Sequence, residues 1–196
     1  MNICVYCASS NAVAPLYFEA ARALGKRIAE RGDTLVYGGA DVGLMGALAR
    51  AVKQGAGHVI GVMPEAIEEM RITFKEADEF IITRDMRERK AVMEARADAF
   101  VTLPGGFGTL EEITEVLTLR QLGLHTKPII IYNVAGFYAP LVALFEHFYR
   151  EQFAKPWQAM YYVADTVDAV FDHLDHHTPE SAPSKLLDPR LDVNEE

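Results

Sequence analysis

The sequence predicts an α/β fold, with a Rossmann-like three-layer α/β/α architecture and a mainly parallel sheet of about seven strands. Two observations predict it. Short apolar runs that suit buried strands alternate along the chain with longer runs whose apolar residues recur at helical spacing. This alternation is typical of a parallel sheet that carries helices on both faces and is connected by right-handed crossovers.

The expected strands are short apolar segments that end at turn-forming residues. The first strand ends at the polar turn Ser9, Ser10 and Asn11, and the third is broken by Pro64. By residue number, we expect strands at 2–8, 34–37, 58–63, 79–83, 99–103, 128–132 and 161–163.

The expected helices carry start and stop signals. Pro15 suits the first turn of the first helix, Leu16, Leu24 and Ile28 share one of its faces, and Gly32 ends it. By residue number, we expect helices at 15–30, 44–54, 85–97, 109–122, 138–153 and 166–176, and the charged stretch 65–76 is compatible with a short helix and a loop.

The stretch 103–112, LPGGFGTLEE, places Gly105, Gly106 and Gly108 between a strand and a helix that is expected to start at Thr109. Glycine lets a backbone approach a ligand closely, and a helix start directs unpaired N–H groups and the positive end of the helix dipole at an anion. The loop therefore predicts a phosphate site, although it matches neither the Walker A pattern nor GxGxxG. Spacing alone favours a capping box instead, in which Thr109 caps the helix and Glu112 reaches back to it.

Other distinctive residues also follow the carboxyl ends of expected strands. Ser9 follows the first strand, GGADVG at 38–43 follows the second, and Arg89 lies just beyond the fourth. Ligands of open parallel sheets bind beyond these ends, so the convergence with 103–112 predicts a nucleotide-sized site. Arg89 and Lys90 also oppose the dipole at the start of their helix, which favours a nearby anion, although a solvated face explains many charge runs.

Length and composition indicate one domain and a tail. The chain has 196 residues, half of them apolar, which suffices for one sizeable core. We therefore expect a single nucleotide-binding α/β domain over residues 1–177. Residues 178–196 contain three prolines and five acidic residues and are expected to form a mobile C-terminal tail.

Composition argues against several classes of protein. A net charge of −9 disfavours broad nucleic-acid binding, which depends on basic patches. The sequence shows no long apolar run and no signal-peptide pattern, so we expect a cytoplasmic protein with no membrane partner. Cys4 and Cys7 have CxxC spacing but lie in an expected strand, so we expect buried thiols. No metal site is expected at His173, His176 and His177, because Cys or carboxylate ligands at a recognised spacing are missing.

Three motifs in this order resemble the LOG family, the cytokinin riboside 5'-monophosphate phosphoribohydrolases, which were historically labelled lysine decarboxylase-like. They are YGGADVGLMG at 37–46, MRERK at 86–90 and PGGFGTLEE at 104–112, and the resemblance extends over about residues 2–176. It implies a Rossmann-like fold and hydrolysis of the N-glycosidic bond of a nucleoside 5'-monophosphate, giving free base and ribose 5-phosphate. It also implies a homodimer with sites near the subunit interface, and no cofactor, pyridoxal phosphate included.

Carried over by position, the resemblance places the catalytic residues at Arg89 and Glu112. The sequence departs from the usual family pattern at Ala8, Ala40 and Arg87, which affects the expected base preference and phosphate affinity more than the reaction class. The expected phosphate and ribose contacts are Lys90, Gly105, Gly106, Gly108, Thr109 and Thr118. From the other loops we expect Ser9, Gly38, Gly39, Gly43 and Met86 to complete the substrate site.

The chemistry of these residues leaves alternatives open. Glu112 can stabilise the positive charge that develops on the sugar and hold ribose hydroxyls, or it can activate the attacking water. Arg89 can hold the phosphate, orient Glu112 or assist the departing base. Apolar residues on several sides of the helix at 109–122 suggest a face for a partner subunit, namely Ile113, Val116, Leu117, Leu119 and Leu122.

Three other functions compete with hydrolysis of AMP or its N6-substituted, cytokinin-type forms. A broader purine and pyrimidine nucleoside monophosphate nucleosidase would differ only in base preference. A non-catalytic nucleotide or cofactor carrier would use the same fold and phosphate loop without cleavage. A pyridoxal-dependent decarboxylase ranks last, because it needs a lysine that forms a Schiff base.

Overall fold

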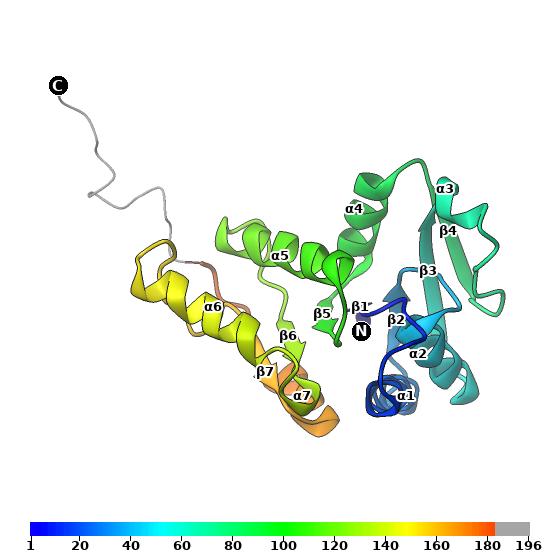
Figure 1. Cartoon of the computed structure of the whole chain (residues 1–196), viewed down its shortest axis with the longest axis horizontal. Helices are drawn as coiled ribbons and strands as arrows, with labels where there is room; N and C mark the ends of the chain where they lie inside the picture. The colour runs from blue at the N-terminus through cyan, green and yellow to red at the C-terminus, as the bar shows by residue number, and fades with distance from the viewer. Residues whose placement is uncertain (183–196) are drawn as a thin grey trace.

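The computed structural model describes residues 1–182, which form one seven-stranded sheet with helices on both faces (Figure 1). The strands pair in the order β4-β3-β2-β1-β5-β6-β7, and every pair is parallel. The expected three-layer architecture is confirmed. The strands are β1 (Asn2–Tyr6), β2 (Thr34–Tyr37), β3 (His58–Pro64), β4 (Glu79–Thr83), β5 (Ala99–Thr102), β6 (Ile129–Tyr132) and β7 (Tyr162–Ala164). The helices are α1 (Pro15–Glu30), α2 (Gly43–Gln54), α3 (Glu65–Glu68), α4 (Met86–Arg96), α5 (Phe107–Gln121), the 3-10 turn η1 (Val134–Gly136), α6 (Ala139–Arg150) and α7 (Val167–His176).

The two faces of the sheet bury separate apolar cores. On β1, Ile3 and Val5 point to the layer of α1, α2 and α7, whereas Cys4 and Tyr6 point to the layer of α4, α5 and α6 (Figure 1). Side chains of a strand alternate between faces, so a strand covered on both sides is apolar throughout. Cys4 and Cys7 are free and lie in different cores, which confirms the expected buried thiols.

The start of α5 differs from the expected one in a way that bears on function. The helix begins at Phe107, Gly106 is its N-cap, and no side chain caps it. The capping box of Thr109 and Glu112 is therefore wrong. Thr109 lies inside the first helical turn, and the carboxylate of Glu112 bonds to Arg89 instead of reaching back to the helix start.

The stretch 65–76 folds as α3 followed by a loop that packs on the glycine loop 38–43. The amide of Asp41 donates to the carbonyl of Ile72 at 2.6 Å, and the amide of Phe74 donates to the carbonyl of Gly39 at 2.9 Å.

The end of α6 differs from the expected one, since the helix stops at Arg150 before the expected 153.

The carboxyl ends of β1, β2 and β5 lie side by side at the centre of the sheet, where the strand order reverses. Open α/β sheets bind ligands at this switch point. The amide of Ala8 donates to the carbonyl of Pro104 at 3.2 Å, and the amide of Leu44 donates to the carbonyl of Ala8 at 2.9 Å. These bonds hold the two glycine loops on either side of the β1 turn.

Across residues 1–182, every helix is too short or too polar to cross a lipid bilayer. The expected tail, 178–196, lies outside the described residues from 183 onward. The C-terminal histidines make local contacts: His173 stacks on the ring of Tyr162 with centroids 4.2 Å apart, and His177 Nε2 lies 3.1 Å from the carbonyl oxygen of Thr126.

Candidate active site

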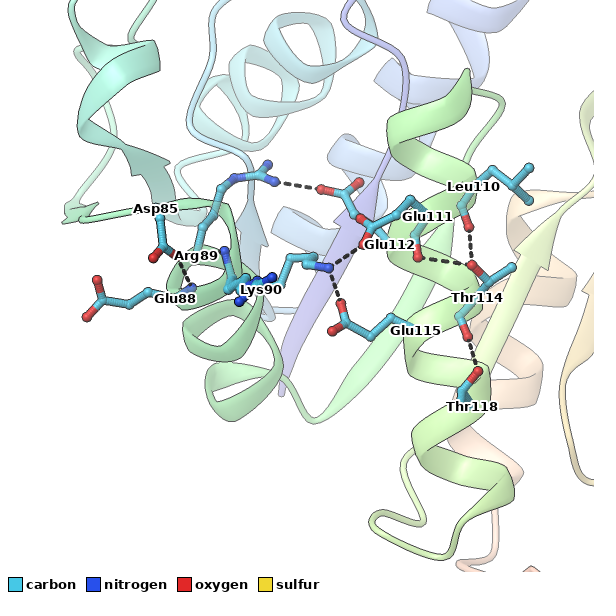
Figure 2. A network of polar contacts seen from close by, with 11 residues as sticks. Asp85, Glu88, Arg89, Lys90, Leu110, Glu111, Glu112, Thr114, Glu115 and Thr118 are labelled. Atoms are coloured by element: carbon cyan, nitrogen blue, oxygen red, sulfur yellow. Dashed lines mark hydrogen bonds and ion pairs between the residues drawn. The ribbon is translucent and has the colours of Figure 1, made fainter.

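A buried ion pair connects α4 to α5 at the switch point. Arg89 Nη1 donates to Glu112 Oε1 at 2.7 Å (Figure 2), and Arg89 Nε donates to the carbonyl of Val62 at 3.0 Å. Each of the two charged residues is only 8% exposed. Buried charges occur in proteins when they are paired and hydrogen-bonded, and a buried pair of this kind is a candidate for a functional site.

The helices place these side chains through ordinary capping and charge pairing. Asp85 caps α4 by accepting the amides of Arg87 at 2.8 Å and Glu88 at 2.9 Å. A carboxylate at this end stabilises the helix dipole, which offsets the cations that follow.

The carboxylates of α5 neutralise the cations of α4. Lys90 Nζ contacts Glu111 and lies 2.7 Å from Glu115 Oε2, while Arg89 contacts Glu112 (Figure 2). The anion that the charge run of α4 favours is therefore supplied at least in part by the protein itself.

Glu112 is a carboxylate with a raised pKa and one unused oxygen. Burial raises its pKa, and the charge and hydrogen bond of Arg89 oppose this without cancelling it. Within residues 1–182, Glu112 Oε2 and Arg89 Nη2 have no protein partner, and neither atom is sealed from solvent. The pair therefore presents one acceptor and one donor that are free to bind a ligand.

Gly38 provides the space that the Arg89 guanidinium occupies. A Cβ at Gly38 would overlap Arg89 Nη2 and would lie 3.1 Å from Met45 Sδ. Arg89 is fixed on its other sides by Val62 and Glu112, so it cannot yield without breaking a bond.

We therefore expect Gly38→Ala to lower kcat/KM for the expected nucleotide substrate by about 10- to 100-fold, since small displacements of a positioned group cost this much. Overpacking should also lower the free energy of unfolding by about 1–3 kcal/mol. Gly25→Ala is the matched control, because its Cβ would lie 2.6 Å from the Leu48 carbonyl oxygen in the core. Equal loss of kcat/KM in both variants would show that Gly38 has no specific role at Arg89.

The helices that follow the two glycine loops differ in whether their first backbone amides have hydrogen-bond acceptors. At α2, the amide of Gly43 donates to Asn11 Oδ1 at 2.9 Å, and the amide of Leu44 donates to Ala8. At α5, the first amide with a partner in the described chain is that of Leu110, which donates to Gly106 at 3.0 Å. The amides of residues 106–109 have no acceptor within residues 1–182, so the start of α5 is open to an anion and the start of α2 is largely closed.

The three glycines of the loop 105–108 have different structural reasons to lack a side chain. At Gly105, a Cβ would overlap the side chain of Thr109, so packing explains the residue. At Gly106 and Gly108, a Cβ would meet no atom within 4 Å, and neither residue has a left-handed φ. Contacts within the protein do not explain these two glycines, whereas close approach of a ligand does.

Comparisons with known proteins identify the family. Residues 45–174 match the family described as "Possible lysine decarboxylase". The cytokinin riboside 5'-monophosphate phosphoribohydrolase LOG of Oryza sativa subsp. japonica is 43% identical over 191 residues, which cover 97% of this chain and 79% of the relative. The chain belongs to the LOG family. Another relative, cytokinin riboside 5'-monophosphate phosphoribohydrolase LOG7 of Arabidopsis thaliana, is 42% identical over 189 residues, covering 95% of this chain and 87% of the relative.

Solved structures share the fold at lower identity. The molybdenum cofactor binding protein of Rippkaea orientalis superposes with a TM-score of 0.69 at 21% identity, covering 89% of this chain and 94% of that protein. The molybdenum cofactor carrier protein of Chlamydomonas reinhardtii gives a TM-score of 0.70 at 22% identity, covering 89% and 95%. At these identities the likeness concerns the fold alone.

The structure brings together most of the residues that the LOG motifs single out. Arg89, Glu112 and Gly38 are in mutual contact or adjacent, and Thr109 lies on the same face of α5 as Glu112 and is 4% exposed. Met86 begins α4 and is 43% exposed.

Some expected substrate contacts have structural roles in this LOG-family chain. Gly43 has a left-handed φ of 55° and packs against Ser9, and Gly39 has a φ of 78° and lies beneath the ring of Phe80. Both glycines are thus explained by backbone conformation, and Ser9 remains exposed beside them.

Thr118 is an expected contact that lies away from the glycine loop. It follows Thr109 by nine positions on α5, which corresponds to roughly 13 Å along the helix axis. Its hydroxyl donates to the carbonyl of Thr114 at 2.7 Å (Figure 2), and it lines a cavity of about 190 Å³ with Phe145 and Trp157. The structure does not bring Thr118 to the open start of α5.

Sequence reasoning missed two groups that support the candidate site. The carbonyl of Val62 fixes Arg89, and Asn11 closes the start of α2. A backbone carbonyl has no sequence signal. Asn11 had one, because Asn in a polar turn commonly accepts hydrogen bonds from backbone amides, but its partner is known only from the fold.

Proposed function

We propose that a single nucleotide-binding domain over residues 1–177 hydrolyses the N-glycosidic bond of a nucleoside 5'-monophosphate. The substrate is AMP or an N6-substituted, cytokinin-type AMP, and the products are the free base and ribose 5-phosphate. The observation that carries this proposal is the buried Arg89–Glu112 pair beside the open start of α5. The names of the curated relatives support the same reaction.

The geometry supports a division of labour along the substrate. The amides at the start of α5, with Gly106, Gly108 and the Thr109 hydroxyl, hold the phosphate. Glu112 lies farther along the same helix face, where the ribose follows the phosphate. Arg89 orients Glu112 through Nη1 and presents Nη2 to the ligand.

In the reaction, the bond between ribose C1' and the base nitrogen breaks, and its electron pair leaves with the base. Positive charge then builds on the ribose, which the carboxylate of Glu112 stabilises. The oxygen of a water forms the new bond to C1', while one of its protons is lost and the base is protonated. Oε2 of Glu112 is the free acceptor suited to receive the water proton, and a raised pKa makes this carboxylate a better base near neutral pH.

Lysine decarboxylation does not suit this site. A pyridoxal enzyme forms a Schiff base through a lysine that must lose its proton. Removal from water lowers the pKa of Lys90, but Glu111 and Glu115 raise it, and the net direction is upward. Lys90 therefore stays charged and paired, and we do not propose the decarboxylase activity.

The test is the release of free base from AMP and from N6-isopentenyl-AMP, followed by chromatography, with CMP and UMP alongside. Release from the two adenine nucleotides alone supports the proposal, and their ratio reports the preference for cytokinin-type substrates. Comparable release from CMP and UMP would identify a broader nucleosidase. Tight nucleotide binding by calorimetry without base release would contradict hydrolysis and favour a carrier.

Gly106→Ala and Gly108→Ala are expected to raise KM for AMP at least about tenfold without weakening the fold, since each 1.4 kcal/mol of lost binding is a factor of ten. Each added methyl group meets no protein atom within 4 Å but narrows the approach of a phosphate. The free energy of unfolding should stay constant or rise by up to about 1 kcal/mol, because alanine restricts the unfolded chain. Urea unfolding and steady-state kinetics check both parts, and an unchanged KM in both variants would contradict the phosphate site.

We also propose that the chain acts as a homodimer in the cytoplasm. Apolar side chains near the site are exposed in the single chain, with Phe107 at 92%, Met86 at 43% and Leu110 at 37%. Exposed apolar side chains are commonly covered by a partner, so these three support a subunit contact close to the site. The free thiols of Cys4 and Cys7 suit a reducing compartment.

The face of α5 that is left for a partner is smaller than expected. Leu122 is 57% exposed, but Ile113, Val116 and Leu117 are buried in the core of the same chain. Light scattering should give the mass of a dimer at micromolar concentration, and a monomer would contradict this proposal.

A further inference from the structure

The loop before α5 is anchored by a hydroxyl from a distant part of the chain. Tyr138, the residue before α6, is 5% exposed, and its hydroxyl donates to the carbonyl of Leu103 at 2.8 Å. Burial raises the pKa of Tyr138, Cys7 raises it further, and the polar backbone of Gly105 opposes this. The hydroxyl therefore anchors the loop at Leu103, directly before Pro104.

Tyr138 is itself held by β6 and β7. Its amide donates to Asn133 Oδ1 at 2.7 Å, and the amide of Asn133 donates to the carbonyl of Ala164 at 2.8 Å. Asn133 Nδ2 also donates to Asp165 Oδ1 at 3.2 Å. In the turn between Asn133 and Tyr138, Ala135 has a left-handed φ of 51°, a conformation that a non-glycine residue keeps only when its surroundings impose it. The position of the tyrosine ring is therefore determined by contacts that do not involve the glycine loop.

The loop needs such an anchor because its glycines allow many backbone conformations. Residues 105–108 include three glycines, which have more conformational freedom than other residues. Within residues 1–182, the segment 103–108 accepts a side-chain hydrogen bond at Leu103, and its donor is Tyr138. Binding of a phosphate by several amides requires that these amides point to one position before the ligand arrives.

We propose that Tyr138 is a positioning residue for nucleotide binding, which holds the glycine loop 103–108 in the conformation that receives the phosphate. It acts through its hydrogen bond to Leu103 and does not touch the substrate. The inference rests on the proposed function, because it assigns the phosphate to this loop. It predicts that the tyrosine hydroxyl affects the binding of phosphate-bearing ligands more than the chemical step.

The test uses Tyr138→Phe, which removes the hydroxyl and keeps the ring in its core position. We expect the affinity for ribose 5-phosphate, measured by calorimetry, to fall about tenfold, the effect of one lost hydrogen bond of ordinary strength. The KM for AMP should rise by a similar factor, while kcat changes by less than about threefold, because the interaction removed is one that acts in binding.

The matched control is Tyr161→Phe, which removes a partly buried hydroxyl whose pKa Tyr149 influences, in the same layer of the fold. Both variants should lose thermal stability, but the control should bind ribose 5-phosphate as the wild type does. Unchanged affinity in Tyr138→Phe, or a fall in kcat at constant KM, would overturn the positioning role. If the wild type itself fails to bind ribose 5-phosphate, the phosphate site and the proposed function fail with it.

Discussion

Glu112→Gln is expected to lower kcat for base release from AMP by at least about 100-fold, the usual size of an acid–base contribution. The amide has the shape of the carboxylate, and its oxygen can still accept the bond from Arg89 Nη1. The negative charge is lost at Oε2, the oxygen that has no protein partner among residues 1–182. An amide neither stabilises a developing cation nor accepts a proton from water, so both roles open to Glu112 predict the same direction.

The matched control is the same substitution one residue earlier. Glu111 is exposed and pairs with Lys90, which keeps Glu115 as a second partner. Glu111→Gln should retain kcat within about threefold, the behaviour of a residue outside the chemical step. AMP binding by calorimetry should be retained in both variants. Full turnover in correctly folded Glu112→Gln would remove Glu112 from the chemistry.

The acidity of Glu112 gives the reaction a predictable pH dependence. Its pKa is raised from the ordinary value of 4.5, mainly by burial. Because the proposed role needs the carboxylate, kcat should fall as pH decreases through that raised pKa, with a midpoint above 4.5. The residual activity of Glu112→Gln should lack this acid limb.

The sequence was sufficient to predict the layers of the fold, and it also predicts where the site lies. Strand–helix alternation predicts a parallel sheet, and loops at the carboxyl ends of β1, β2 and β5 must meet if these strands are neighbours. The recurrence of glycine after two of these strands predicts that the site lies at this edge of the sheet. These predictions depend on local patterns, which the sequence carries directly.

The assignment of roles within the site depends on contacts that the sequence does not carry. The spacing of Thr109 and Glu112 fits a capping box and also fits one face of a helix, and only the contact with Arg89 decides between them. The two glycine loops look alike as sequence, yet Asn11 closes one and leaves the other open. Tyr138 gave no signal, because its target is the backbone of Leu103.

Arg89→Met is the second change with a large expected effect, and it acts on stability as well as activity. Removing the guanidinium leaves Glu112, which is 8% exposed, without a buried counter-ion. Breaking a buried pair from one side costs about 3–5 kcal/mol when the remaining group stays charged. Base release should also fall, because Glu112 loses the donor that orients it.

This destabilisation should depend on pH with a defined sign. Arg89 lowers the pKa of Glu112 against the effect of burial, so the pKa rises further when Arg89 is removed. A carboxyl group whose folded pKa lies above its unfolded value favours the folded state when protonated, and that contribution is lost as pH rises through the interval between the two values. The deficit of Arg89→Met relative to wild type, measured by urea unfolding, should therefore be smaller at pH 5 than at pH 8.

The double variant Arg89→Met, Glu112→Gln distinguishes two causes of the lost stability, namely the loss of the ion pair and the burial of an unpaired Glu112 carboxylate. If the cost of Arg89→Met comes from the unpaired carboxylate, the second substitution should recover much of the stability at pH 8 and abolish its pH dependence, while base release stays low. Arg84→Met is the control, because Arg84 pairs with Glu88 at the surface and such pairs contribute little. Additive losses in the double variant would mean that Arg89 and Glu112 stabilise the fold independently, and the pair could then not be the coupled unit that the proposed reaction requires.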